Sequence, residues 1–282
     1  AIESLEAVNR RIHDGVPLDQ LLQRGRSYCD RLFDPFPEAA PKPGDSVLEL
    51  GSGVGWVMEA MLERFAIEEI VGLDISSNMI SRAQERLSDA RARFVLYDGL
   101  HIPFPNDHYP VIYSVAAIQH IEKHAAFLLF EELFRVLRPG GHGLIHLLSV
   151  DHIPGAVPTY HDECWNHVLN RPVHWHHYYA FDELMVLFSD VIGATDLDII
   201  HDPSSHAFVV HFSKGTGCPF RRPEIVRQRF TNHQSAAAPS GLPQARGWRP
   251  LLREALALLP ASAQRAVRRL PATRALRGRP PT

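Results

Sequence analysis

The chain has 282 residues, of which 45% are hydrophobic and 22% are charged, and its 29 Lys and Arg face 32 Asp and Glu. This length and apolar content support one large α/β domain, or one domain with an appendage. No run approaches the roughly 20 apolar residues of a membrane-spanning helix. Its three widely spaced cysteines exclude a disulfide framework and favour a reducing compartment. We therefore expect a cytoplasmic protein.

Charge divides the chain into two parts. Residues 1–214 contain 16 Lys and Arg against 30 Asp and Glu, a balance of −14, whereas residues 215–282 contain 13 against 2, a balance of +11. An acidic body with a basic, Pro- and Arg-rich extension is predicted.

In chain order, residues 1–40 predict a helical N-terminal cap, and "PKPGD" at 41–45 breaks the chain before the first strand. Strands and helices then alternate, which predicts a seven-stranded, mostly parallel, doubly wound α/β sheet over residues 41–214. The predicted strands are 46–50, 69–73, 92–96, 111–115, 142–148, 196–200 and 207–212. The predicted helices are 54–65, 77–88, 124–137 and 181–188, with an insertion at 150–180.

The stretch "VLELGSGVGW" at 47–56 joins the first strand to the first helix through three glycines. Such a turn lets a ligand approach the backbone and the helix N-terminus. Dinucleotide-binding proteins place the last glycine of their motif where this chain has Trp56, and a carboxylate at Glu49 is unfavourable beside a pyrophosphate. The pattern therefore favours a ligand that carries positive charge.

S-adenosylmethionine (SAM) is such a ligand, and residues 45–214 resemble the class I SAM-dependent methyltransferases. Four motifs match in order: the glycine turn, Asp74 in "VGLDIS", "YDG" at 97–99 and "LRPGG" at 137–141. The resemblance implies that Asp74 binds the ribose, Ile75 lies against the adenine, and Asp98 contacts the adenine amino group. The cofactor-binding residues that it implies are Glu49, Gly51, Ser52, Gly53, Gly55, Asp74, Ile75, Asp98, Gly99 and Val115. A glycine turn in another Rossmann-like fold is the competing interpretation.

The segment at the end of the fourth predicted strand, "SVAAIQHI" at 114–121, lacks the Asp/Asn-Pro-Pro-aromatic motif of base methyltransferases. The two-glutamate loop of arginine methyltransferases is also missing, so we do not expect a nucleic-acid partner. Transfer to a hydroxyl needs a base near neutral pKa, usually a histidine. His146, near the end of the fifth strand, and His120, after the fourth, are the candidate catalytic residues. Histidines that only pack in the core are the alternative for both.

The insertion is rich in histidine and aromatic residues, which suit stacking and hydrogen bonding to a sugar or polyol. Its candidate substrate-binding residues are Trp165, His174, Trp175 and Tyr178. An aromatic subdomain that packs on itself is the alternative. His161, Cys164 and His167 are too few for a closed zinc site. Mg²⁺ could orient an acceptor hydroxyl, but the spacing assigns no metal ligand.

We predict a SAM-dependent O-methyltransferase that acts on a hydroxyl of a small molecule or an oligosaccharide, with a sugar in polysaccharide biosynthesis favoured. The alternatives are a phenol or other natural-product methyltransferase, an N- or C-methyltransferase, an aminopropyl transferase, and a non-catalytic SAM-binding subunit. For the basic extension, packing on the body or homodimer contacts, weak contact with a membrane or polyanion, and disorder all stay open.

Overall fold

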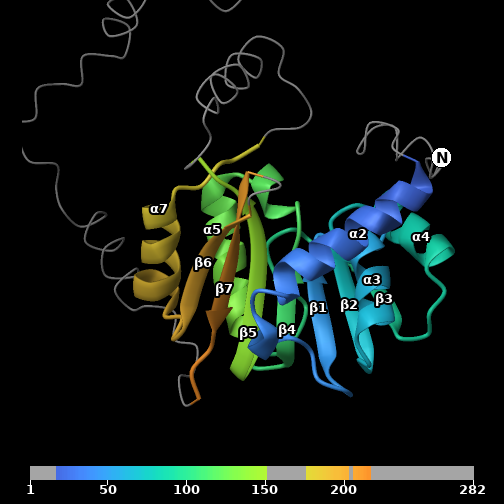
Figure 1. The fold of residues 1–282 in the computed structure, drawn as a ribbon, viewed down its shortest axis with the longest axis horizontal. Helices are drawn as coiled ribbons and strands as arrows, with labels where there is room; N and C mark the ends of the chain where they lie inside the picture. Colours follow the sequence, from blue (N-terminus) through green and yellow to red (C-terminus); the bar gives the residue numbers. More distant parts are fainter. Residues whose placement is uncertain (1–16, 151–175, 203–205, 217–282) are drawn as a thin grey trace, which may run out of the picture. The chain divides into compact units, whose positions relative to one another are not determined.

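A computed structural model describes residues 17–150, 176–202 and 206–216 of the chain. Within these ranges the alternating pattern forms one seven-stranded sheet with helices on both faces (Figure 1). Most of the insertion, the first 16 residues, and the basic extension after residue 216 lie outside the described residues. The strands are β1 (Ser46–Leu50), β2 (Glu69–Asp74), β3 (Ala92–Leu96), β4 (Tyr109–Ser114), β5 (Leu137–Leu148), β6 (Leu197–Asp202) and β7 (Ala207–Ser213).

The strand order is β3-β2-β1-β4-β5-β7-β6, with β7 antiparallel to both of its neighbours and the other pairs parallel. This confirms the predicted mostly parallel, doubly wound sheet. The chain runs outward from β1 through β2 to β3 and then returns to place β4 on the other side of β1. The carboxyl ends of β1 and β4 therefore flank the point where the strand order reverses, which is where open α/β sheets bind ligands.

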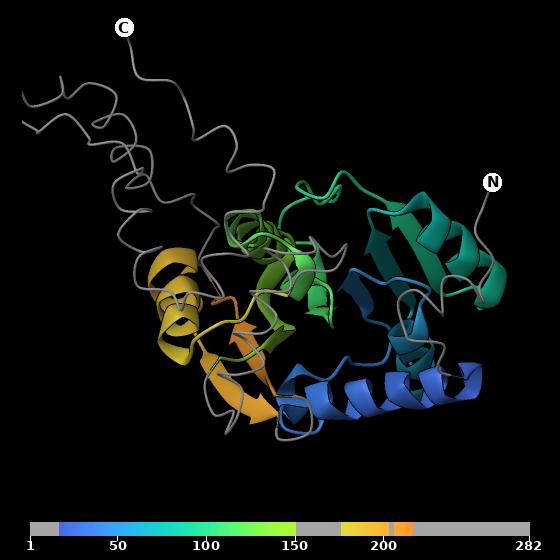
Figure 2. The same ribbon diagram turned by 90° about the horizontal axis from the view of Figure 1, so that it is seen from above.

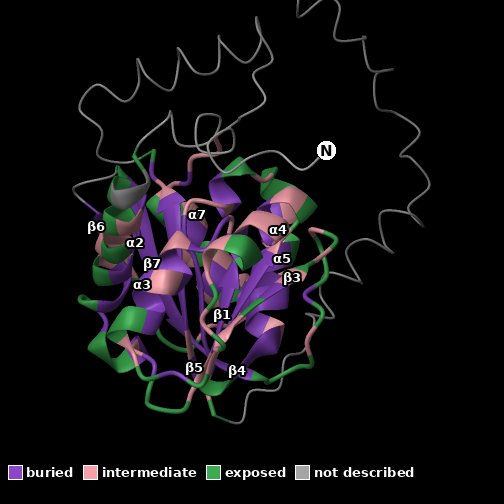
Figure 3. Ribbon diagram, turned by 90° about the vertical axis from the view of Figure 1, so that its right-hand side faces the viewer, coloured by how far each residue is buried: buried purple, intermediate pink, exposed green. Residues whose placement is uncertain are grey.

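The helices divide between two apolar clusters, one on each face of the sheet, and Figure 2 shows α2 and α5 on opposite sides of it. One face packs against α2 (Leu18–Phe33), η1 (Pro37–Ala39), α3 (Trp56–Arg64) and α4 (Ser77–Arg86). The other packs against η2 (Ile118–His120), α5 (Lys123–Val136), α7 (Phe181–Met185) and η3 (Val186–Ile192). The central strands are buried along most of their length (Figure 3).

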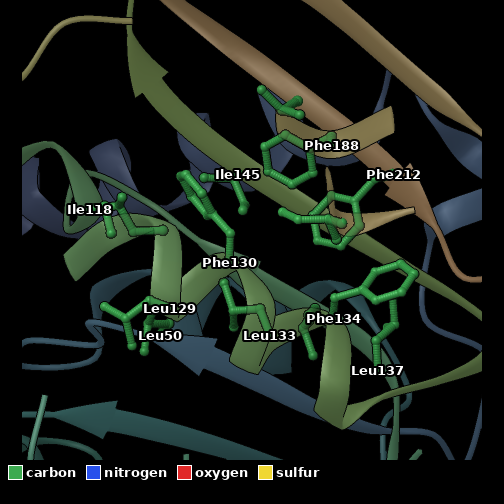
Figure 4. Close-up of a cluster of buried hydrophobic side chains, with 14 of the residues drawn as sticks. Leu50, Ile118, Leu129, Phe130, Leu133, Phe134, Leu137, Ile145, Phe188 and Phe212 are labelled. Atoms are coloured by element: carbon green, nitrogen blue, oxygen red, sulfur yellow. The ribbon is translucent and has the colours of Figure 1, made fainter. Parts of the chain in front are cut away.

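The core between α5 and the sheet is built largely of phenylalanine and leucine. Phe130 and Phe134 of α5 lie close to Phe188 and Phe212, which come from η3 and β7 (Figure 4). Each of these four rings is at most 1% exposed. Aromatic rings that meet in tilted geometry add to the free energy of burial, so this cluster fixes α5 and η3 against the sheet.

Several element boundaries differ from the predicted ones for local reasons. The helix predicted at 54–65 begins at Trp56, because Gly55 adopts a left-handed φ of 80°. The "LRPGG" turn is instead part of β5, which begins at Leu137. The helix predicted at 181–188 becomes a π-helix after Met185 and ends at Gly193, whose φ is 83°. Ser76 caps α4 by accepting a hydrogen bond from the Met79 amide.

Lys214 directly follows β7, and its side chain is fully buried. Its ammonium donates to the carbonyl oxygens of Phe134 and Leu137 at 3.1 and 3.0 Å, and to Asp107 Oδ1 at 2.5 Å. The C-terminal carbonyls of α5 thus receive a cation, which the helix dipole favours. Within the described ranges, no helix is long and apolar enough to cross a membrane.

Candidate functional site

The glycine loop, residues 51–55, follows β1 and leads into α3. Gly51, Gly53 and Gly55 have φ values of 77°, 53° and 80°, a region that residues with a Cβ rarely adopt. The amides of Gly51 and Ser52 donate to the carbonyl oxygen of Leu73, at 2.8 and 2.9 Å. These bonds attach the loop to the end of β2, and the positive φ at residues 51, 53 and 55 explains why the sequence has glycine at these alternate positions.

The turn after β4 lies directly against this loop. A Cβ built on Gly51 would approach the Cβ of Ala117 to 2.1 Å, so only hydrogen fits there. The preceding residue, Ala116, has a φ of 52°, an unusual conformation for a residue that is not glycine. Val115, a predicted cofactor-binding residue, is buried at the start of this turn. The sequence motifs do not reveal this contact between the glycine loop and Ala117.

Asp74 ends β2 beside the glycine loop. Its Oδ2 accepts a hydrogen bond from the Gly53 amide at 2.9 Å, and its Oδ1 accepts one from the Ser76 amide at 2.8 Å. Burial raises the pKa of this carboxyl, against the opposing effect of the backbone amides. Because each carboxylate oxygen has two lone pairs, Asp74 retains acceptor capacity for a ligand hydroxyl. Its role toward the ribose stays a prediction.

Ile75 lies beside the loop that follows β3. Its side chain is 67% exposed, and a Cβ on Gly99 would lie 3.3 Å from Ile75 Cγ2. Asp98 accepts hydrogen bonds from the amides of His101 and Leu100, and these bonds lower the pKa of its carboxyl to about 2. Asp98 is therefore ionised at neutral pH and shapes this loop, while its contact with the adenine stays a prediction.

Glu49 is 2% exposed, and its Oε2 accepts a hydrogen bond from the Tyr113 hydroxyl at 3.1 Å. Burial raises the pKa of the Glu49 carboxyl to about 8, and the nearby charge of Asp74 acts in the same direction. The carboxyl is thus mostly neutral at pH 7, and a nearby cation would favour its ionised form. Tyr113 was not singled out in the sequence, because a tyrosine in a buried strand is indistinguishable from ordinary core.

His120 ends η2, and its side chain is exposed. The structure brings it to His176, whose ring centroid lies 4.8 Å away at an interplanar angle of 43°. His177 fixes this arrangement, because its amide donates to the carbonyl oxygen of Gln119 at 2.7 Å and its Nε2 lies 3.7 Å from Glu122 Oε2. The end of the insertion therefore meets the turn after β4. His176 was absent from the predicted site residues.

His146 lies on the face of β5 that α2 covers. It is 3% exposed, its ring meets Tyr28 edge-to-face at 5.3 Å, and its Nε2 lies 3.6 Å from Asp202 Oδ2. Burial lowers the pKa of the His146 imidazole to about 4, although the charge of Asp202 opposes this. This setting favours a packing role over the predicted role as base, which stays an untested prediction.

Some of the remaining predicted site residues lie within the described ranges and others lie outside them. Ser52 is buried in the glycine loop, and Tyr178 is half-buried beside His177. Trp165, His174 and Trp175 lie outside the described residues, as do the His161, Cys164 and His167 of the zinc alternative. In the described part of the chain, no group of three or more His, Cys, Asp or Glu residues is arranged to hold a metal ion.

The residues around the loop suit SAM better than a phosphate-bearing cofactor. Asp74 provides a carboxylate beside the loop, the buried Glu49 carboxyl would ionise more readily next to a cation, and the exposed Ile75 offers an apolar surface for a base. Arg86 is the cation beside the loop, but its guanidinium donates to the carbonyl oxygens of Val54 and Gly55, at 2.8 and 2.7 Å. It also pairs with Glu59. The Arg86 guanidinium thus donates to the loop and to Glu59 rather than to a ligand phosphate.

Comparison with known proteins agrees with this chemistry. Residues 47–141 match the family described as "Methyltransferase domain". The chain is 34% identical over 107 residues to phosphoethanolamine N-methyltransferase 2 of Caenorhabditis elegans, covering 37% of this chain and 24% of that protein. It is 31% identical over 163 residues to malonyl-[acyl-carrier protein] O-methyltransferase of a Marinomonas species, covering 57% and 56%. It is 32% identical over 130 residues to sterol 24-C-methyltransferase of Schizosaccharomyces pombe, covering 44% and 34%.

The chain thus spans between about a quarter and just over half of these relatives. Solved structures share the fold at lower identity. A SAM-dependent methyltransferase from Methanosarcina mazei superposes with a TM-score of 0.52 at 15% identity, covering 64% of this chain and 97% of that one. Phosphoethanolamine N-methyltransferase 2 of Haemonchus contortus, in complex with phosphomonomethylethanolamine and S-adenosylhomocysteine, also gives 0.52 at 16% identity, covering 69% and 53%.

Proposed function

Because this chain carries a class I SAM-dependent methyltransferase domain, we propose that it transfers the methyl group of SAM to a hydroxyl of a small molecule or oligosaccharide. A sugar hydroxyl is the first acceptor to test. The main support for hydroxyl transfer is the pairing of His120 with His176 at the end of the sheet where β1 and β4 meet. The insertion's histidine and aromatic composition supports the choice of a sugar.

The chemistry of the acceptor explains why an imidazole supports the proposal. Bound SAM supplies a methyl group made electrophilic by the adjacent sulfonium. An alcohol is a weak nucleophile until its proton is removed, and a histidine near neutral pKa suits that task. His120 is the favoured base because it is exposed beside the Ala116–Ala117 turn. His176 acts as a positioning residue in this proposal, since its ring orients that of His120.

The three curated relatives transfer to nitrogen, oxygen and carbon according to their names. The family therefore leaves the acceptor atom open. Amine and phenol acceptors are accordingly the rivals that the test must include. A cytoplasmic location, homodimer formation and polyanion contact through the basic extension stay predictions.

The test incubates the full chain with SAM and separate mannose- and glucose-based oligosaccharides, phenols and phosphoethanolamine. Mass spectrometry then measures S-adenosylhomocysteine and the methylated product, with and without Mg²⁺. Product from an oligosaccharide alone supports the full proposal. Product from phenols alone keeps O-transfer and rejects the sugar, whereas product from phosphoethanolamine alone rejects hydroxyl transfer. SAM binding with no product from any acceptor supports a non-catalytic subunit.

Once an acceptor is found, matched variants separate the two candidate bases. We expect His120→Gln to lower turnover by about 10²–10⁴-fold, the usual contribution of a general base, with SAM affinity near wild type. We expect His146→Gln to change stability more than turnover. Full turnover in His120→Gln would remove His120 from the role.

A further inference from the structure

The last residue of α4 reaches across to the glycine loop. Arg86 donates from Nε to the Val54 carbonyl oxygen at 2.8 Å and from Nη2 to the Gly55 carbonyl oxygen at 2.7 Å. Nη1 pairs with Glu59 of α3, and the guanidinium lies 4.0 Å from the centroid of the Trp56 ring. The Arg86 side chain is only 12% exposed. One side chain thus binds two successive carbonyls, a carboxylate and an aromatic face.

These contacts fix the orientation of two peptide groups. In a trans peptide the carbonyl and the following amide point in opposite directions. Holding the Val54 and Gly55 carbonyls toward Arg86 therefore turns the amides of Gly55 and Trp56 away from it. The Gly55 amide donates to the Ser52 carbonyl at 2.8 Å, which closes the turn. The Trp56 amide belongs to the first turn of α3, where amides lack helical acceptors.

The loop needs an external restraint because of its composition. Three of its five residues are glycine, which loses more conformational freedom on ordering than any other residue. A ligand that had to order such a loop would bind more weakly by the cost of that ordering. Gly55 is also enclosed, since a Cβ there would lie 3.0 Å from Phe94 and 3.4 Å from Arg86 Nη2. Arg86 and Phe94 of β3 therefore both enclose Gly55.

We propose that Arg86 is a positioning residue for the methyl donor: it holds residues 54–56 in the binding conformation without touching the donor. This rests on the proposed function, in which SAM binds at the glycine loop. Arginine is required because its planar fork bonds both carbonyls and Glu59 at once and also stacks on Trp56, which a lysine ammonium cannot do. The expected signature is a loss of donor affinity in a protein that remains folded.

The test uses Arg86→Met and Arg86→Lys in the full chain, with Arg82→Met as the matched control. Arg82 lies one turn earlier in α4 and pairs with Glu85 of the same helix. Calorimetry with S-adenosylhomocysteine gives the Kd, and circular dichroism gives the unfolding midpoint. We expect Arg86→Met to raise the Kd by about 10-fold or more, the scale of two charge-assisted hydrogen bonds. Arg86→Lys should raise it by about 5-fold or more, and Arg82→Met should stay within about twofold of wild type.

Each outcome decides one point. A lower unfolding midpoint with an unchanged Kd in both Arg86 variants makes the residue merely structural and overturns the proposal. If Arg86→Met fails to fold, Arg86→Lys carries the test by the same criterion. Faster amide hydrogen exchange at Gly55 and Trp56 in folded Arg86→Lys is a second expected result. A wild-type chain that binds neither SAM nor S-adenosylhomocysteine contradicts the proposed function instead, independently of Arg86.

Discussion

The backbone of Gly51 touches the side chain of Ala117: a Cβ added to the glycine would lie 2.1 Å from that of the alanine. The loop after β1 and the turn after β4 are therefore packed against each other before any ligand binds. Methyl transfer needs donor and acceptor aligned to within fractions of an ångström. A contact that sets the distance between these two segments is therefore expected to control donor binding.

We expect Gly51→Ala to raise the Kd for S-adenosylhomocysteine by about 10-fold or more, because the new methyl group separates the two segments. The left-handed φ adds about 1–2 kcal/mol of strain. Gly44→Ala is the control, since its φ is 84° and no atom lies within 4 Å of the added Cβ. That variant should lose only the stability that corresponds to the backbone strain and should keep the wild-type Kd. Adding Ala117→Gly should restore part of the affinity of Gly51→Ala, and a complete lack of rescue would refute the steric explanation.

Asp74→Asn should weaken S-adenosylhomocysteine binding by about 10–100-fold, the scale of one hydrogen bond to a charged group. An asparagine offers one acceptor oxygen where Asp74 uses two, for the amides of Gly53 and Ser76. Calorimetry at pH 7.5 measures the change. Asp89→Asn, which alters an acid paired with Arg91 in the loop after α4, is the control. Equal affinities for Asp74→Asn and wild type would remove the carboxylate from the donor site.

Glu49 should make the protein less stable as the pH rises from about 4.5 to about 8. Its pKa is raised by burial from 4.5 to about 8, so the folded state holds a proton that the unfolded state has released. The contribution of this proton to the free energy of unfolding is therefore fully present below pH 4.5. It is lost as the pH rises to about 8, and the loss is on the order of a few kcal/mol. Glu49→Gln should flatten this slope in urea unfolding at pH 5, 6.5, 8 and 9. The exposed Glu63→Gln should leave the slope in place, and an unchanged slope in Glu49→Gln would contradict the assignment.

His146 should make the protein less stable at acid pH. Because burial lowers the pKa of its imidazole from 6.5 to about 4, the unfolded state binds the proton first. The stability it contributes is complete above pH 6.5 and is lost as the pH falls through 4, by on the order of 3 kcal/mol. His146→Gln should reduce the loss of unfolding free energy between pH 7 and pH 4. The exposed His124→Gln on α5 should not, and equal acid sensitivity in both variants would refute this account.

The sheet was predictable because its signals are local. The alternation of apolar runs and helical patterns, together with the glycines at 51, 53 and 55, fixes the strands and the switch point between β1 and β4. The boundaries that differ arise from backbone geometry, as at Gly55, whose left-handed conformation delays the start of α3. A sequence pattern carries no record of such dihedral angles.

The positions of site residues could be predicted from the sequence only where these residues belong to a motif. Asp74 and Ile75 follow a strand at the expected place, and the structure puts both beside the loops that the motifs predict. Tyr113, Ala117 and Arg86 act through contacts between residues separated by 27 to 66 positions, and nothing in their local sequence marks them. For His146 the sequence does not reveal the surroundings, because its place in a strand does not show that α2 covers its face of the sheet.

The buried ammonium of Lys214 determines where the chain can be shortened. A fragment that stops at Ser213 would leave the carbonyls of Phe134 and Leu137 and the exposed carboxylate of Asp107 without the buried ammonium that binds them together. A fragment that starts at Pro41 would likewise lack α2, and would lose Cys29 and Phe33 from their contacts with Met61 and Phe65. The smallest piece worth expressing for crystallisation or NMR therefore runs from before Leu18 to beyond Lys214.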